Sequence, residues 1–146
     1  MTALEQREHV VAEARTWLGT PFHDNAAVRG AGVDCAHLVA AVYEAAGVIA
    51  PQDIEAYSPQ WFLHRDAERF LAYVERVARE IEPEALQPGD LVLYRIGRAY
   101  AHGAIVVDWP GSIIHAHKLS GFVVRSGAFE MDLRDRAVRG FTFWPD

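Results

Sequence analysis

The chain has 146 residues, of which 51% are hydrophobic, so residues 1–146 can bury one core as a single domain without disulfides or structural metals. Its formal net charge of -6 and its pI near 5.6 exclude the clustered basic face that nucleic-acid binding requires. No apolar run is long enough for a membrane span, and charged residues interrupt the first 19 positions, which predicts synthesis in the cytoplasm without a signal peptide.

Helices are predicted from the start of the chain. Apolar residues recur at helical spacing over residues 3–18, and Gly19-Thr20-Pro21 ends that helix. Residues 22–33 are rich in Asp, Asn and Gly and are typical of a loop. A second apolar helical pattern begins at Cys35, with Asp34 as the expected N-cap.

Helical patterns continue through the first half of the chain. Gly47 ends the helix of the cysteine, and a loop follows over residues 48–57. Ser58-Pro59 is a favourable helix start, with proline at the first helical position. Asp66 restarts a helix whose apolar face extends to about Ile81.

The second half of the chain predicts a sheet. A turn at residues 86–90 precedes five short apolar runs, at residues 91–94, 103–107, 112–117, 122–125 and 141–144. No helices lie between these runs to make parallel crossovers, so we expect a meandering antiparallel sheet. The predicted fold class is therefore α+β, with N-terminal helices packed on about five strands.

Cys35 is the only cysteine, and its position suggests chemistry. The positive end of the helix dipole at the first turn stabilises a thiolate over a thiol. His102 and His115 lie in strand patterns on either side of Pro110-Gly111, a hairpin signal, which favours adjacent antiparallel strands. If the strand register places them on one face, His102 can take the thiol proton while His115 fixes its tautomer.

Five motifs in order resemble a known family. They are Gly-Thr-Pro-Phe, Asp-Cys-Ala-His-Leu-Val, Leu-Gln-Pro-Gly-Asp-Leu-Val-Leu-Tyr, Ala-His-Gly-Ala-Ile-Val-Val and Ile-Ile-His-Ala-His. Their order and spacing are similar to those of NlpC-type cell-wall cysteine peptidases, the NlpC and p-sixty superfamily. The resemblance implies a papain-like α+β fold and hydrolysis of peptidoglycan stem peptides, commonly between D-glutamate and meso-diaminopimelate. It implies Cys35 as nucleophile, His102 as general base and His115 as the third, polar member, with no cofactor.

The loop before Cys35 resembles one subgroup of this family. A histidine after Gly-Thr-Pro-Phe and the long Asp-Asn-Ala-Ala-Val-Arg-Gly-Ala-Gly segment resemble short single-domain members encoded in phage and phage-like tail gene clusters. This implies that the protein reaches the wall within a tail or after lysis. Its expected partners are the peptidoglycan stem peptide and tail-tip proteins, with no nucleic acid and no membrane.

Two positions depart from the family pattern. Phe22 stands where many members have a tyrosine whose hydroxyl helps the oxyanion site, and His23 is the nearest substitute. His37 stands two places after the cysteine, where a small residue is usual. At that helical spacing it points away from the thiol, so we expect it to shape a pocket wall or to pack. Asp34 is expected to act as a cap rather than in the chemistry.

Several alternatives remain open from the sequence. His117 lies on the same strand face as His115 and could replace it as the third member. The three strand histidines could also form a metal site, although their spacing matches no compact ligand motif. The main rival function is a tail assembly or structural component that keeps the fold with little activity. A related thiol amidase or acyltransferase is the third possibility.

Overall fold

The computed structural model describes residues 1–50 and 65–145, so the predicted helix start at Ser58-Pro59 lies outside the described residues. Within these ranges the helices are α1 (Ala3–Arg15), α2 (Cys35–Ala45) and α3 (Arg65–Val77). A two-stranded ribbon precedes α2 and consists of β1 (Ala27–Val28) and β2 (Gly32–Val33). The main sheet comprises β3 (Arg79–Ile81), β4 (Leu91–Ile96), β5 (Ala99–Asp108), β6 (Ser112–His117), β7 (Phe122–Ser126) and β8 (Val138–Thr142).

Helix α1 begins with a capping box. The Thr2 hydroxyl accepts the backbone N–H of Glu5 at 3.1 Å, and the Glu5 carboxylate accepts the Thr2 backbone N–H at 3.2 Å. Val10 and Ala14 are fully buried, as the periodicity predicted, whereas Leu4 is 65% exposed. Leu4 lies in the first turn of α1, and its side chain is not covered by the core.

The predicted start of the cysteine helix is confirmed. Asp34 has extended backbone and its side chain accepts the N–H of His37, so Cys35 is the first residue of α2. Leu38 and Val42 are fully buried on one face of this helix. The helix ends at Ala45, and Gly47 follows with a φ of 75°, in the left-handed region that glycine adopts without strain.

The main sheet is antiparallel throughout, in the order β3-β8-β4-β5-β6-β7. Strands β4 to β7 form the predicted meander, and β8 returns to pair with β4. The prediction of a helix reaching Ile81 is wrong, because α3 ends at Val77 and the chain then forms β3 against β8. Extended pairing is favoured there because Arg139 on β8 contacts Glu80 at 2.6 Å across the strands.

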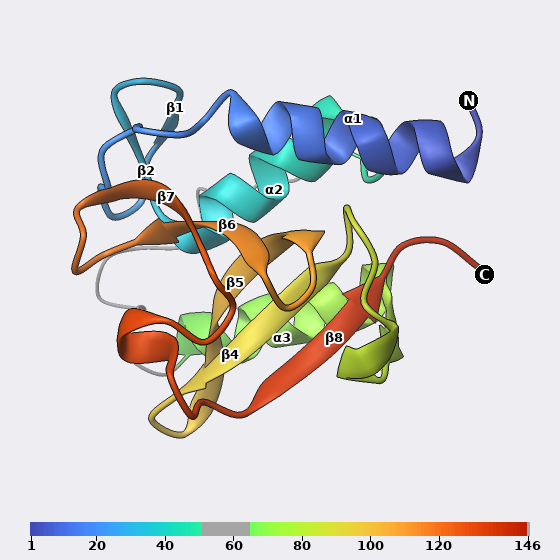
Figure 1. The fold of residues 1–146 in the computed structure, drawn as a ribbon. Helices are drawn as coiled ribbons and strands as arrows, with labels where there is room; N and C mark the ends of the chain where they lie inside the picture. Colours follow the sequence, from blue (N-terminus) through green and yellow to red (C-terminus); the bar gives the residue numbers. More distant parts are fainter. Residues whose placement is uncertain (51–64, 146) are drawn as a thin grey trace.

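Two apolar clusters cover the two faces of the sheet. The helices pack on the first, where Val10, Leu38 and Val42 meet Leu91, Ile105 and Ile114. Figure 1 shows α1 and α2 together on one side, with α3 running behind β4 and β5. The second cluster contains Tyr94, Ala104 and Ile113 and is covered by Ala128 and Leu133, which follow β7. Among the described residues, no helix combines the length and the apolar character needed to cross a membrane.

Candidate functional site

Cys35 lies where the start of α2 meets β5. Its Sγ is 3.5 Å from the carbonyl oxygen of Ala101, the residue directly before His102. The thiol faces a cavity of about 350 Å³. The cavity is lined by Phe22, Asp24, Cys35, Ile96, Ala101, His102, Ala116, His117, Lys118, Leu119, Asp132 and Leu133. The cysteine and the first predicted histidine therefore share one cavity.

The thiol is held in its neutral form. Burial raises the pKa of Cys35 to about 12, and the negative charge of Asp34 adds to the rise. The backbone amides of Gly103, Ala36 and Cys35 itself act in the opposite direction. The amides at the helix start favour the thiolate, as predicted, but desolvation outweighs them and the net shift of the pKa is upward. Deprotonation of Cys35 at neutral pH therefore needs a proton acceptor.

His102 and His115 form a hydrogen-bonded pair. Nε2 of His102 is 2.8 Å from Nδ1 of His115, and the two rings are 5.0 Å apart at an angle of 81°. The pairing of Ile105 with Ile114 sets the register of β5 and β6 so that both histidines lie on the face of the second apolar cluster. The sequence left open whether His102 and His115 share a face of the sheet, and the strand register places them on the same face.

Both rings of this pair are neutral at pH 7. The pKa of His102 is lowered to about 4, mainly by burial and also by its electrostatic interaction with His117. Burial also lowers the pKa of His115 to about 3, with the neighbouring imidazoles adding to the effect. A neutral imidazole has an unprotonated ring nitrogen, so His102 can accept a proton.

His117 has partners of its own. Its Nδ1 is 2.5 Å from Oγ of Ser120, and its Nε2 is 2.6 Å from Oδ1 of Asp132. The Ser120 backbone N–H also points at Nδ1, at 3.1 Å, so this nitrogen is an acceptor and Nε2–H donates to the carboxylate. His117 lines the cavity, but the residue that bonds His102 is His115. The geometry therefore favours His115 over His117 as the third member.

Asp34 joins the preceding loop to the helix of the cysteine. This carboxylate is fully buried, and its Oδ1 accepts the backbone N–H of His37 at 2.9 Å and lies 2.8 Å from the His37 Nδ1. Oδ2 accepts the backbone N–H of Asn25 at 2.7 Å. His37 is 5% exposed and is not among the residues that line the cavity. Of the two roles expected for His37, the structure gives it packing against Asp34.

Phe22 and His23, the first two residues of the loop at residues 22–33, have different surroundings. Phe22 lines the cavity, and its ring has no hydrogen-bond donor. His23 is exposed and outside the cavity lining, and its Nδ1 is 3.0 Å from the carbonyl oxygen of Asp24. The structure does not bring His23 to the thiol, so the backbone amide of Cys35 is left as the expected oxyanion donor.

Sequence reasoning missed two residues of this site. Ser126, at the end of β7, contacts the second ring nitrogen of His115 at 3.0 Å, and Asp132 contacts His117. Neither belongs to a motif, and only the strand register and the fold of the segment after β7 bring them here. In the described part of the chain, no group of three or more His, Cys, Asp or Glu side chains is placed to hold a metal ion.

Cys35, at a helix start, shares a cavity with His102, whose ring is hydrogen-bonded to His115. This is the composition of a cysteine–histidine site, in which a base serves a sulfur nucleophile. The sequence profile of the NlpC/P60 family matches residues 19–134, and the chain belongs to this family. No curated protein was found as a sequence relative of the chain.

Solved structures share the fold. The NlpC/p60 domain of the peptidoglycan hydrolase SagA has a TM-score of 0.62 and 23% identity, covering 91% of this chain and 96% of that domain. A lipoprotein-like NLP/P60 protein from Staphylococcus aureus has a TM-score of 0.65 and 23% identity; the match covers 92% of this chain but 41% of that one. RipD from Mycobacterium tuberculosis, described as a non-catalytic NlpC/p60 domain protein adapted to peptidoglycan binding, has a TM-score of 0.59 and 16% identity, covering 95% and 98%.

Proposed function

We propose that the protein is a cysteine peptidase that hydrolyses an amide bond in the stem peptides of peptidoglycan. The observation that carries this proposal is the neutral imidazole pair: His102 is bonded to His115 and lines the cavity that Cys35 also lines. A family that includes a named peptidoglycan hydrolase supports the choice of substrate class.

The mechanism begins from a neutral thiol and a neutral imidazole. Nδ1 of His102, the ring nitrogen that does not bond His115, takes the thiol proton as Sγ attacks the scissile carbonyl carbon. The new oxyanion is stabilised by the Cys35 backbone N–H at the positive end of α2. His102 then gives its proton to the departing amine, which leaves a thioester on Cys35. Water activated by His102 hydrolyses the thioester and restores the thiol.

For the bond that is cut we propose the link between D-glutamate and meso-diaminopimelate. Stem peptides carry both carboxylates and ammonium groups around this link. The cavity offers side chains of both charges, because Lys118, Asp24 and Asp132 are all in its lining. These side chains give a charged peptide a means of orientation next to Cys35.

For the biological setting we propose a phage or phage-like tail. The support is the resemblance of residues 22–32 to short tail-encoded family members, with tail-tip proteins as partners and the virion tail or release at lysis as the location. Immunogold labelling of purified particles from a host that carries the gene should label one end of the tail. Label found only in the soluble fraction would refute the tail assignment and leave the peptidase proposal standing.

The activity is tested by digestion of purified muropeptides with the wild type and with Cys35→Ala. We expect the wild type to release a product with a new amine on diaminopimelate, identified by mass spectrometry, and Cys35→Ala to release none. Equal product from both proteins, or none from either across pH and reducing conditions, would refute the proposal. A new amine elsewhere in the stem peptide would correct only the bond.

A second candidate function is peptidoglycan binding or tail structure without turnover. The observation in its favour is the raised pKa of the partly buried Cys35 thiol, and a protein that shares this fold is described as non-catalytic. It predicts that wild type and Cys35→Ala bind muropeptides equally and that neither cleaves them. A thiol amidase or acyltransferase is distinguished by profiling other amide and acyl substrates, with transfer to an added amine as the readout.

A further inference from the structure

Ser126 ends the hydrogen-bond chain that begins at His102. The chain runs from Nε2 of His102 to Nδ1 of His115 at 2.8 Å, and from Nε2 of His115 to Oγ of Ser126 at 3.0 Å. The Ser126 hydroxyl in turn donates to the carbonyl oxygen of Gly127 at 3.0 Å. No sequence motif includes this serine, and the mechanism above does not use it.

The direction of this chain decides which ring nitrogen of His102 is free. A carbonyl oxygen can only accept, so the single hydrogen of Ser126 is directed to Gly127 and Oγ accepts from His115. His115 must then carry its proton on Nε2, which makes its Nδ1 an acceptor. His102 therefore carries its proton on Nε2 and presents an unprotonated Nδ1.

We propose that Ser126 is a positioning residue that fixes the tautomers of His115 and His102 so that His102 is a base toward Cys35. This inference deepens the proposed function and rests on it for its catalytic consequence. In the reverse arrangement Ser126 would donate to His115, and His102 would carry its proton on Nδ1. That ring nitrogen could not then accept the thiol proton.

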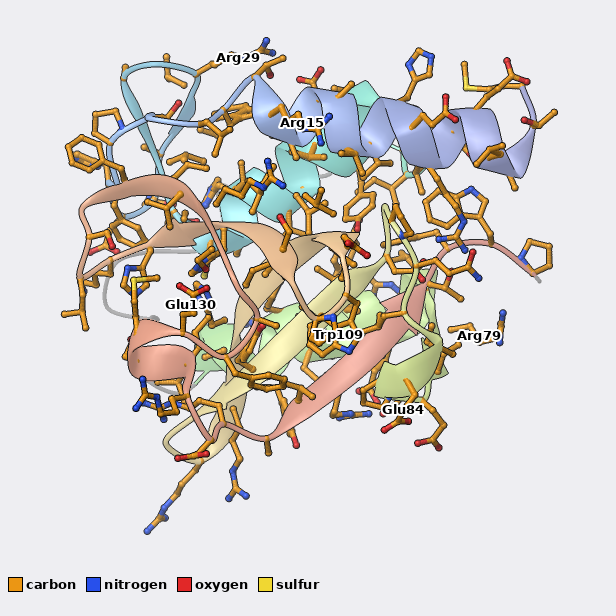
Figure 2. The ribbon with its side chains drawn as sticks, viewed as in Figure 1. Arg15, Arg29, Arg79, Glu84, Trp109 and Glu130 are labelled. Atoms are coloured by element: carbon orange, nitrogen blue, oxygen red, sulfur yellow. The ribbon has the colours of Figure 1, made fainter. Side chains whose placement is uncertain are left out.

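The surroundings favour the arrangement that leaves His102 basic. The Gly127 backbone N–H donates to Oε1 of Glu130 at 2.9 Å. The next peptide, whose carbonyl accepts the serine hydroxyl, is held by the Ala128 N–H, which donates to the carbonyl oxygen of Pro110 at 2.9 Å. Figure 2 labels Glu130 in the segment that follows β7. His115 is fully buried, so water does not compete for its ring nitrogens. The neutral state of both rings, required for a defined tautomer, follows from the same burial.

The tautomers are measured by long-range proton–nitrogen correlation NMR at pH 7.5. We expect His102 and His115 of the wild type to carry the proton on Nε2, and Ser126→Ala to mix the two tautomers at both rings. Ser126→Thr, which keeps the hydroxyl, should restore the wild-type pattern. Ser112→Ala is the matched control, because this serine accepts from Nε of Arg125 at 2.7 Å and does not join the imidazole chain. Protons on Nδ1 in the wild type, or unchanged tautomers in Ser126→Ala, would overturn the proposal.

Muropeptide hydrolysis gives the catalytic readout. We expect Ser126→Ala to lower kcat about tenfold with KM unchanged, consistent with the loss of one buried hydrogen bond that biases the base. Ser126→Thr should recover most of kcat, and Ser112→Ala should match the wild type. An unchanged kcat in Ser126→Ala would overturn the positioning role. If the wild type cleaves nothing, the proposed function fails, while the NMR result still decides whether Ser126 sets the tautomers.

Discussion

His102 and His115 are kept neutral mainly by burial, which disfavours the charged imidazolium. Their rings bond each other, and burial is the main reason that the pKa of each lies well below 6.5. Because the folded chain resists protonation at these two rings, acid favours the unfolded chain, which binds both protons near pH 6.5. The lowered pKa values therefore affect both the chemistry of the site and the stability of the fold.

The free energy of unfolding should fall as the pH is lowered from about 6.5 to about 4. The unfolded chain binds protons at both histidines near pH 6.5, whereas the folded chain binds them only near 4 and 3, so stability is present above 6.5 and lost below it. Each histidine contributes a slope of up to about 1.4 kcal/mol per pH unit. Urea unfolding across this range should give a steeper slope for the wild type than for the double variant His102→Asn, His115→Asn. Identical slopes would contradict the lowered pKa values.

At the residue scale, sequence reasoning found the members of the site that occur in motifs and missed those that do not. Cys35, His102 and His115 were placed together from their patterns, and the structure brings all three to one region. Ser126 could not be found because it depends on the pairing of β7 with β6, which no local signal sets. The net pKa of the thiol could not be predicted, because burial depends on the whole fold, whereas the effect of the start of α2 can be inferred locally.

Elements α1 and α2 begin with caps of different kinds. The cap of α1 is exposed and involves only Thr2 and Glu5, whereas Asp34 at the start of α2 is fully buried and also holds His37 and Asn25. Because Asp34 joins the loop of residues 22–33 to the helix that carries Cys35, we expect it to matter more for stability than an ordinary cap.

Removal of the two N-caps should lower the free energy of unfolding by unequal amounts. Thr2→Ala should lower the free energy of unfolding by about 1 kcal/mol, the usual value for an N-cap. Asp34→Ala should lower it by about 3 kcal/mol, since the backbone N–H of Asn25 and the buried ring of His37 also lose their partner. Asp34→Asn, which keeps an acceptor at the cap, should fall between them. Chemical denaturation measures all three, and equal losses for Thr2→Ala and Asp34→Ala would refute the joining role.

Element prediction succeeded where the apolar period was unambiguous. The start of α2 and the four strands of the meander were predicted nearly at their observed positions. The predicted loop at residues 22–33 contains β1 and β2, and the last strand runs over Val138–Thr142 rather than residues 141–144. The largest error came at β3, where Arg79, Glu80 and Ile81 fit a continued helix as well as a strand. Pairing with β8, supported by the contact between Arg139 and Glu80, decided between the two. That partner is about 60 residues away, so no local window contains it.

At the scale of the whole molecule, one buried cation joins the two layers. Arg7 on α1 bonds Oδ1 of Asp90 at 2.9 Å and Oγ1 of Thr142 at 3.2 Å, and its guanidinium stacks on Trp144 with 4.2 Å to the ring centroid. Tyr43 on α2 donates to the carbonyl of Gly89 in the same turn, at 2.8 Å. The sequence predicted this turn but not that both helices are tied to it. These contacts set the position of α2, and hence of Cys35, relative to β5.

The fold brings Cys35 on α2 to a base on β5, and the rate at which iodoacetamide alkylates Cys35 at pH 7.5 measures whether that base acts on the thiol. Because burial keeps the thiol protonated, the reaction depends on proton transfer to His102. We predict that His102→Ala slows alkylation by at least about tenfold. His117→Ala should react at nearly the wild-type rate, since His117 is bonded to Ser120 and Asp132. Equal rates for the wild type and His102→Ala would show that His102 is not the base for Cys35.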